Sequence, residues 1–560
     1  MPRVDEGPVA AAATAPAPPS TFIATALIAL GVITAVLVIV GLAINDGHFL
    51  YVFDDTAIHM SMARQLADHG TWGVTAHHYA SASSSPGWTL LLTAFSFLFP
   101  VARDGLPLLL NLAAAAWVLI LIGRHQTLLR FRRGEWLPIT VTVFSVAILW
   151  FLPGLALAGM EHLLHAALVL VALVLVDRLV HDEYSTRTVR RLLLVLALAS
   201  TVRFETAFIA AGIAVAFFCL ARPTFGRDTR AVITRARAWW LGVGVLLACA
   251  APIGLYSVIN RAFGEGYLPN SILAKTGSGR VLGIARAPQS ALAVLETDPA
   301  LLTLMLITFA YLAWAASDGP QRNAAIAIVF LVAALLHVFL ADIGWFERYQ
   351  AYLVIAGSLV AFRIAAEVFS PARRKRVLVV VLILISTLAF GKAVLLAEVP
   401  LAESNTYRQR YQLARFLHRY YDGHAFLTGE LGYTTLLHNG AVIDILGLGT
   451  YPIAVARHNG VQTLDAQFVE RLARESRVRV MAFYAGGPGF KIPKGWEAVA
   501  QWHLDEPKVS IPDTAIAFYA RKGAPAREME RHLRAFQAEL PSRVSTLYRA
   551  ELIKQYLKNL

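Results

Sequence analysis

The chain is poor in charged residues and in cysteine. Only 16% of its 560 residues are charged, whereas a soluble globular domain carries about 25%. Its two cysteines, Cys219 and Cys249, both lie inside apolar segments, so the sequence predicts small hydrophobic core residues and no disulfide framework. The sequence also lacks a Gly-Lys-Ser or Gly-Lys-Thr phosphate loop, which argues against an ATP-driven reaction in this chain.

Long apolar runs dominate the composition instead. Hydrophobic residues make up 57% of the chain, and residues 21–44 form 24 consecutive positions without a charge, enough to cross the ~30 Å hydrocarbon core of a bilayer. Similar runs recur almost to residue 399, so the sequence predicts a polytopic α-helical membrane protein. We expect eleven crossings, at residues 21–44, 106–122, 137–155, 160–176, 192–202, 204–221, 239–260, 299–316, 323–341, 350–370 and 377–399.

Basic residues gather in the short loops between these runs. The clusters are Arg124–Arg133, Arg178–Arg191, Arg222–Arg237 and Arg373–Arg376. Short basic loops are typical of the cytoplasmic side of a membrane protein, which places the N-terminus inside and the chain beyond residue 400 outside. The net charge of +13 is then a topology signal, and we expect no nucleic-acid partner.

The composition divides the chain into three parts. Residues 1–20 are rich in Ala and Pro and are predicted to form a disordered cytoplasmic tail. Residues 21–399 form the membrane domain, whose first extracytoplasmic loop is 45–100. Within that loop, residues 87–100 are apolar but short for a span, so we expect a re-entrant or juxtamembrane helix. The segment 192–221 is left open as two spans or one kinked span.

Residues 400–560 have shorter apolar runs that alternate with charged stretches. Ala425–Thr428, Ala441–Ile445 and Val478–Phe483 are predicted as strands, because they are short and apolar. The segments near 405–420, 464–476 and 526–539 have helical spacing, and 541–558 is predicted as an amphipathic helix. These patterns indicate a small α/β domain outside the membrane.

Two adjacent carboxylates, Asp54 and Asp55, follow the first span closely. Charges so near a membrane exit are usually functional. A carboxylate can take the proton from an attacking hydroxyl, and its neighbour could hold the base, bind a sugar hydroxyl or bind a divalent cation such as Mg, Mn or Ca through oxygen. The competing interpretation is a solvated cap of the helix that starts there.

Three cationic residues, Arg203, Lys275 and Arg348, fall on the predicted outer face and are candidate phosphate ligands. Each also has a structural interpretation. Arg203 could pair with Glu205 or Glu161, Arg348 could pair with Glu347 or Asp342, and Lys275 could extend toward the headgroups. Glu161 could bind a sugar hydroxyl or a cation instead of pairing with Arg203.

These residues stand in motifs that resemble a known family. Phe53–His59, Ala63-Arg64, His69-Gly70 and Ser84–Leu91 resemble the first extracytoplasmic loop of GT-C glycosyltransferases. Gly159–Glu161, Val202–Glu205, Leu268–Asn270, Ala274-Lys275 and Glu347–Tyr349 resemble the branch that contains terminal arabinofuranosyltransferases of mycobacterial cell-wall arabinan, together with related pilin- and polysaccharide-modifying enzymes. The departures Phe204 and Ser271 from the branch pattern mean that the motifs do not specify the sugar.

The resemblance implies a donor of polyprenyl-phosphate sugar type and a single displacement with inversion at the anomeric carbon. It implies that Asp54 is the general base and that Asp55 positions the acceptor or a cation. Arg203, Lys275 and Arg348 would neutralise the departing phosphate, and the other expected substrate-binding residues are Glu161, Glu205, Asn270 and Tyr349.

We therefore expect an integral membrane glycosyltransferase of the bacterial cytoplasmic membrane, with its active site and C-terminal domain on the extracytoplasmic face. It would move a sugar, for example arabinofuranose, to an extracytoplasmic glycan or protein. The alternatives are a transporter or flippase of lipid-linked sugars, a non-catalytic receptor for such lipids, and a mannosyl- or aminoarabinose-type transferase on the same fold.

Overall fold

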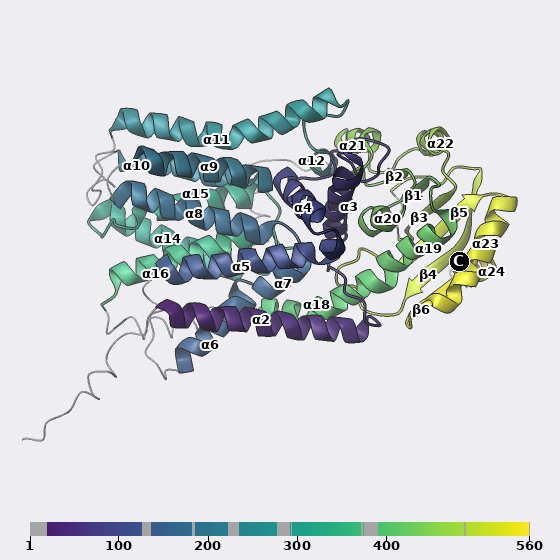
Figure 1. Ribbon diagram of the computed structural model, residues 1–560, viewed down its shortest axis with the longest axis horizontal. Coiled ribbons are helices and arrows are strands. Elements are labelled where there is room, and N and C mark those ends of the chain that lie inside the picture. Colours follow the sequence, from purple (N-terminus) through teal and green to yellow (C-terminus); the bar gives the residue numbers. More distant parts are fainter. Residues whose placement is uncertain are drawn as a thin grey trace, which may run out of the picture.

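The computed structural model describes residues 19–125, 136–181, 185–221, 234–276, 292, 294–370, 373, 390–486 and 489–558. Long helices lie side by side in a bundle, and a domain with a β-sheet covers one end of it (Figure 1). Residues 1–18 of the predicted cytoplasmic tail lie outside the described residues.

The bundle consists of apolar helices that share one continuous hydrophobic core. They are α2 (Pro19–Ile44), α5 (Leu106–His125), α6 (Trp136–Phe144), η2 (Ser145–Leu149), α7 (Leu152–Ala158), α8 (His162–His181), α9 (Thr186–Val202), α10 (Thr206–Leu220), α11 (Arg235–Ala262), α14 (Pro299–Ser317), α15 (Ala324–Leu340), α16 (Ala351–Val368) and α18 (Phe390–Asn405). Small residues allow close packing: a Cβ on Gly212 of α10 would lie 2.6 Å from the backbone oxygen of Val329 on α15.

Seven helices among the described residues are long and apolar enough to cross a membrane. They coincide with seven of the eleven predicted crossings, and the polytopic helical class is confirmed. The segments 204–221 and 323–341 form the shorter apolar helices α10 and α15, and the segment 377–399 is described only from residue 390. Residues 192–221 form two helices, because the chain is extended at Arg203 between α9 and α10.

Short helices stand between the bundle and the sheet domain. They are α3 (Asp54–His69), α4 (Pro86–Leu98), η1 (Pro100–Gly105) and α12 (Asn270–Thr276). Helix α3 lies across the end of the bundle (Figure 1). The predicted juxtamembrane segment 87–100 forms the 13-residue helix α4, which ends at Leu98 before the 3₁₀ turn η1.

The sheet domain contains six strands in the order β2-β1-β3-β5-β4-β6. Strand β1 (Phe426–Thr428) pairs in parallel with β2 (Val442–Asp444) and with β3 (Val480–Tyr484). Strands β5 (Ala515–Arg521), β4 (Trp496–Leu504) and β6 (Val544–Tyr548) extend the sheet in antiparallel fashion. The helices are η4 (Thr406–Tyr411), α19 (Gln412–Tyr421), α20 (Gly432–Leu437), α21 (Tyr451–His458), α22 (Ala466–Glu475), α23 (Ala524–Phe536), η5 (Gln537–Glu539) and α24 (Arg549–Lys558).

The three predicted strands correspond to β1, β2 and β3. The prediction of one helix over 541–558 is wrong in its first half, because residues 544–548 form β6 and only α24 is helical. Most side chains in Val544–Tyr548 are partly or fully exposed, which fits the position of β6 at the edge of the sheet.

The sheet domain is joined to the bundle end by a continuous helical path and by direct hydrogen bonds. Helix α18 passes into the π-helix η4 and then into α19. The Thr406 hydroxyl donates to the backbone oxygen of Val52 (3.1 Å), and the Tyr433 hydroxyl accepts from the backbone N–H of Tyr51 (3.0 Å). The domain therefore packs directly on the loop that carries the acidic pair.

Candidate active site

Asp54 forms the main contact between the first loop and the sheet domain. Its two carboxylate oxygens accept hydrogen bonds from the backbone N–H groups of Gly432 (2.7 Å) and Tyr433 (3.0 Å). These groups belong to the first turn of α20, where unpaired N–H groups favour an anion. The alternative interpretation, a cap on its own helix, is not what the structure shows, because α3 has no side-chain cap and Asp54 instead accepts from the first turn of α20.

Burial raises the pKa of Asp54, although Arg410 and the two backbone N–H groups oppose this shift. Arg410, in η4, donates to Glu430 (2.6 Å), which lies just after β1. Burial likewise raises the pKa of Glu430 to about 7. The buried pair of Glu430 and Arg410 and the partly buried Asp54 carboxyl thus lie where the first loop meets the carboxyl end of a parallel strand.

Asp55 faces the other way and pairs with Arg348. The Oδ2 atom of Asp55 lies 2.8 Å from Nη2 of Arg348, and the Asp55 side chain is 37% exposed, against 4% for Arg348. The guanidinium also lies 4.6 Å from the ring centroid of Phe53 and donates to the Tyr349 hydroxyl (3.0 Å). Asp55 is thus the more exposed partner of this ion pair.

A second buried arginine, Arg203, also lies near Tyr349. Nη1 of Arg203 donates to Glu161 (2.7 Å), and its Nε donates to Glu205 (3.1 Å). Burial by itself raises the pKa of Glu205, but Arg203 lowers it to about 2. The guanidinium carbon of Arg203 lies 5.8 Å from the ring centroid of Tyr349. The ion pairs that the sequence offered as alternatives for Arg203 are both present.

Glu161 connects this arginine to the helix that carries the acidic pair. The carboxylate is fully buried. Its Oε2 atom lies 3.8 Å from Nε2 of His59 on α3 and, among the described residues, accepts no hydrogen bond. Six candidate residues therefore form one contact network, while Asp54 contacts the sheet domain instead. The six are Asp55, Glu161, Arg203, Glu205, Arg348 and Tyr349.

Asn270 and Lys275 are not part of this contact network among the described contacts. The backbone N–H of Asn270 donates to Ser81 (3.0 Å), and its side-chain amide donates to Glu265 (3.2 Å), which accepts from the backbone N–H of Ser81. Asn270 thus holds the polar loop before α4. Lys275 lies in α12, and its side chain is outside the described residues.

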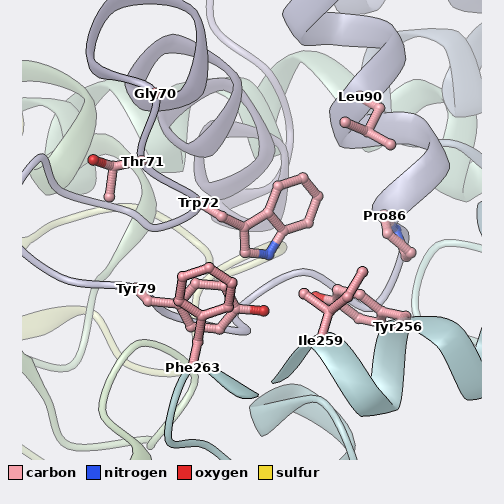
Figure 2. A pocket seen from close by; sticks show the side chains of 9 residues that line it. All are labelled: Gly70, Thr71, Trp72, Tyr79, Pro86, Leu90, Tyr256, Ile259 and Phe263. Carbon is pink, nitrogen blue, oxygen red and sulfur yellow. The ribbon is translucent and has the colours of Figure 1, made fainter. Parts of the chain in front are cut away.

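A groove of about 490 Å³ opens beside that loop. Figure 2 shows the Trp72 and Tyr79 rings at this space, with Phe263 against Tyr79. The Tyr79 and Phe263 rings are stacked, with centroids 4.6 Å apart. The walls also include Gly70, Thr71, Pro86, Leu90, Tyr256 and Ile259. Its apolar and aromatic lining suits a hydrocarbon chain or the face of a sugar ring.

The residues at the acidic pair do not fit a divalent cation. Asp55 already faces the Arg348 guanidinium, and the described part of the chain contains no group of three or more His, Cys, Asp or Glu residues that could hold a metal. We therefore derive no step through a metal, and the predicted Mg, Mn or Ca site at Asp55 stays a prediction.

Sequence reasoning names Glu347 but misses its partners Lys392 and Asp298. Glu347 lies 2.8 Å from Nζ of Lys392, and Asp298 lies 2.9 Å from the same atom. Lys392 lies in the predicted span 377–399, and Asp298 follows Glu296 in a short polar stretch outside the motifs. A lysine within an otherwise apolar run was the one available signal.

Comparison with solved structures identifies the architecture. ArnT from Cupriavidus metallidurans, crystallised with undecaprenyl phosphate, superimposes with a TM-score of 0.50 at 13% identity, covering 88% of this chain and 98% of ArnT. The chain has the ArnT fold. The predicted GT-C type of fold is thereby confirmed.

Other comparisons are more distant or more local. Apo ArnT gives a TM-score of 0.47 at 14% identity, with 81% of this chain and 92% of ArnT covered. The Archaeoglobus fulgidus oligosaccharyltransferase gives 0.45 at 11% identity, with 90% and 77% covered. A profile for a domain of unknown function (DUF8728) matches residues 401–520, and no curated protein matches the chain.

Proposed function

We propose that this protein is an integral membrane glycosyltransferase that moves a sugar from a polyprenyl-phosphate donor to an extracytoplasmic acceptor. The observation that carries the proposal is the pairing of the half-open carboxylate of Asp55 with the buried guanidinium of Arg348 at the end of an ArnT-like bundle. The ArnT crystal contains undecaprenyl phosphate, a lipid of the class that the reaction would release.

The reaction is a single displacement with inversion. An acceptor hydroxyl oxygen forms a bond to the anomeric carbon, and its proton passes to a carboxylate. The bond from the anomeric carbon to the donor phosphate oxygen breaks, and its electron pair leaves with polyprenyl phosphate. A buried guanidinium stabilises this developing charge strongly, because little water screens it. We assign that role to Arg348, and Arg203 lies near the same Tyr349 ring.

The contacts favour Asp55 as the base. The Asp54 carboxylate is held by two backbone N–H groups of α20, whereas the Asp55 side chain is 37% exposed and faces the Arg348 guanidinium. When donor phosphate takes over Arg348, the Asp55 carboxylate gains basicity because it loses a cationic partner. Asp54, the base implied by the family resemblance, would instead anchor the sheet domain.

This geometry changes which substitution tests the mechanism. In Asp54→Asn, the amide nitrogen would face one of the two backbone N–H donors, so the variant would loosen α20 as well as remove a base. Asp55→Asn keeps the side-chain shape and leaves α20 undisturbed. It also removes a carboxylate that competes with phosphate for Arg348, so donor binding should not weaken.

The identity of the sugar rests on the resemblance alone. A pentofuranose such as arabinofuranose remains the sugar we propose, with mannosyl and aminoarabinose donors as the competing choices. The sheet domain and the acidic pair lie at the same end of the bundle (Figure 1). That arrangement supports our proposal that both face the extracytoplasmic side of the bacterial cytoplasmic membrane.

The test uses full-length protein in detergent with several polyprenyl-phosphate sugars. Release of free polyprenyl phosphate should occur with one donor and should fall by about 10²–10⁴-fold in Asp55→Asn, with donor binding retained. Undiminished release in that variant would refute Asp55 as the base. Binding without release for every donor and acceptor, combined with transport of lipid-linked sugar in vesicles, would refute the enzyme in favour of a flippase.

A further inference from the structure

A network of charged and amide side chains holds the turn that directly precedes Arg348. Lys392 on α18 is 5% exposed and contacts Asp298 (2.9 Å) and Glu347 (2.8 Å). The amide nitrogen of Gln350 donates to the same two carboxylates, at 3.2 Å and 2.9 Å. Asp298 also caps α14 by accepting from the backbone N–H of Leu301 (3.1 Å). The network therefore joins α14, α18 and the turn that precedes α16.

The turn itself has an unusual backbone. Trp345, Phe346 and Glu347 are three consecutive non-glycine residues with positive φ angles of 49°, 62° and 61°. L-residues disfavour this region because Cβ crowds the following carbonyl oxygen. Such a conformation persists only where surrounding contacts over-determine it. Here the Glu347 carboxylate is fixed by Lys392 and Gln350, and Gly344 donates its N–H to Gln350 (2.9 Å).

The turn sets where Arg348 lies. Phe346 packs edge-on against Phe53, with ring centroids 5.2 Å apart. The Arg348 guanidinium lies over the same Phe53 ring and reaches Asp55. Because Arg348 directly follows Glu347, a change in the anchoring of Glu347 would move the guanidinium that faces the acidic pair.

We propose that Lys392, Asp298 and Glu347 are positioning residues that hold the left-handed turn at 345–347, so that the Arg348 guanidinium is preset beside Asp55 to receive the donor phosphate. This inference rests on the proposed function for its ligand. Because Lys392 lies on α18, which continues into η4 and the sheet domain, the same network connects the position of Arg348 to the docking of that domain.

The first test measures binding of undecaprenyl phosphate to full-length protein in detergent, for Lys392→Met, Arg348→Ala and the double variant. Losing a charge-assisted contact typically weakens binding by about tenfold, and we expect that loss in each single variant. The double variant should bind no more weakly than Arg348→Ala, because Lys392 acts through Arg348. Unchanged binding in Lys392→Met, or effects that multiply in the double variant, would overturn the proposal.

The second test does not depend on the ligand. Phenylglyoxal modifies exposed arginines, and Arg348 is buried in the native protein. Lys392→Met should raise modification of Arg348 several-fold, read by peptide mass spectrometry. The matched control is Arg363→Met, which breaks an ion pair with Asp177 (2.7 Å) near the other end of α16. Modification of Arg348 should stay at the native level there, and an equal rise in both variants would show only general loosening.

The two tests separate the inference from the proposed function. If the native protein binds no undecaprenyl phosphate but Lys392→Met exposes Arg348, the positioning network stands and the proposed donor is wrong. If Lys392→Met does not fold, Glu347→Ala provides the same tests, because it frees the turn while Lys392 keeps Asp298 as its partner. Native-like protection of Arg348 in a folded Glu347→Ala protein would overturn the inference.

Discussion

Glu347 makes the stability of this protein depend on pH in a way that one substitution can isolate. Burial and the neighbouring Asp298 raise the pKa of Glu347 to about 7, against the opposing effect of Lys392. The groups that face it are Asp298 before α14, Lys392 on α18 and Gln350 at the start of α16. With one lysine between two carboxyls, the neutral form of Glu347 is the one that this site favours.

The direction and the size of the change in stability with pH follow from this pKa shift. The folded-state pKa of Glu347 lies above the ordinary value of 4.5. Glu347 therefore contributes its full stabilisation of the folded protein below about pH 4.5, and this stabilisation is lost as the pH rises through 7. A rise of the Glu347 pKa from 4.5 to about 7 changes the free energy of unfolding by about 3 kcal/mol. Glu347→Gln mimics the protonated side chain at every pH and removes this loss.

The assay is thermal or denaturant unfolding of the detergent-purified protein between pH 5 and pH 8.5. Near pH 5 the native protein and Glu347→Gln should have similar stability, and by pH 8.5 the variant should be more stable by about 3 kcal/mol. Glu347→Ala is the control, because it should show the same altered pH dependence with lower stability throughout. Parallel stability curves for the native protein and Glu347→Gln would refute the reasoning, since Glu347 would then not change its charge in this range.

Two glycine substitutions test the packing of the site and of the bundle. Gly432→Ala should lower transfer activity strongly while the protein stays folded, because the new Cβ would overlap the backbone oxygen of Asp54 and lie 2.7 Å from its Oδ1 atom; activity together with limited proteolysis of the sheet domain would check this. Gly212→Ala should lower stability by about 1–3 kcal/mol without changing affinity for undecaprenyl phosphate, because its Cβ would lie 2.6 Å from the Val329 oxygen. Native proteolysis and activity in the first variant, or a native unfolding temperature in the second, would contradict these contacts.

The sequence predicted six of the residues that gather, because charges in an apolar chain are few, but it also included Asn270, which lies elsewhere, and missed Lys392 and Asp298. It did not predict how they pair. Arg348 pairs with Asp55, while its neighbour Glu347 faces Lys392. Local spacing favours pairs between neighbours, but a left-handed turn at 345–347 points consecutive side chains in directions that no helical or strand period describes.

The sheet shows the same limit. Short apolar runs predicted β1, β2 and β3, which are buried on both faces. Strand β4 mixes buried and partly exposed positions, and β6 is mostly partly exposed, so their patterns are less distinct from those of an amphipathic helix. The pairing of β6 with β4 fixes residues 544–548 as a strand, and pairing partners are not visible in one segment alone.

The position of Asp54 also determines what a deletion of the sheet domain can show about the role of that domain. The groups that hold the Asp54 carboxylate are backbone N–H groups of residues 432 and 433. Deleting residues 404–560 would therefore remove both hydrogen-bond donors from this partly buried carboxylate. Loss of transfer in such a truncation would therefore not show that the domain binds acceptor. Full transfer to a long acceptor by a folded truncated protein would be far more informative, because it would show that Asp55, Arg348 and Arg203 suffice without the domain that closes over Asp54.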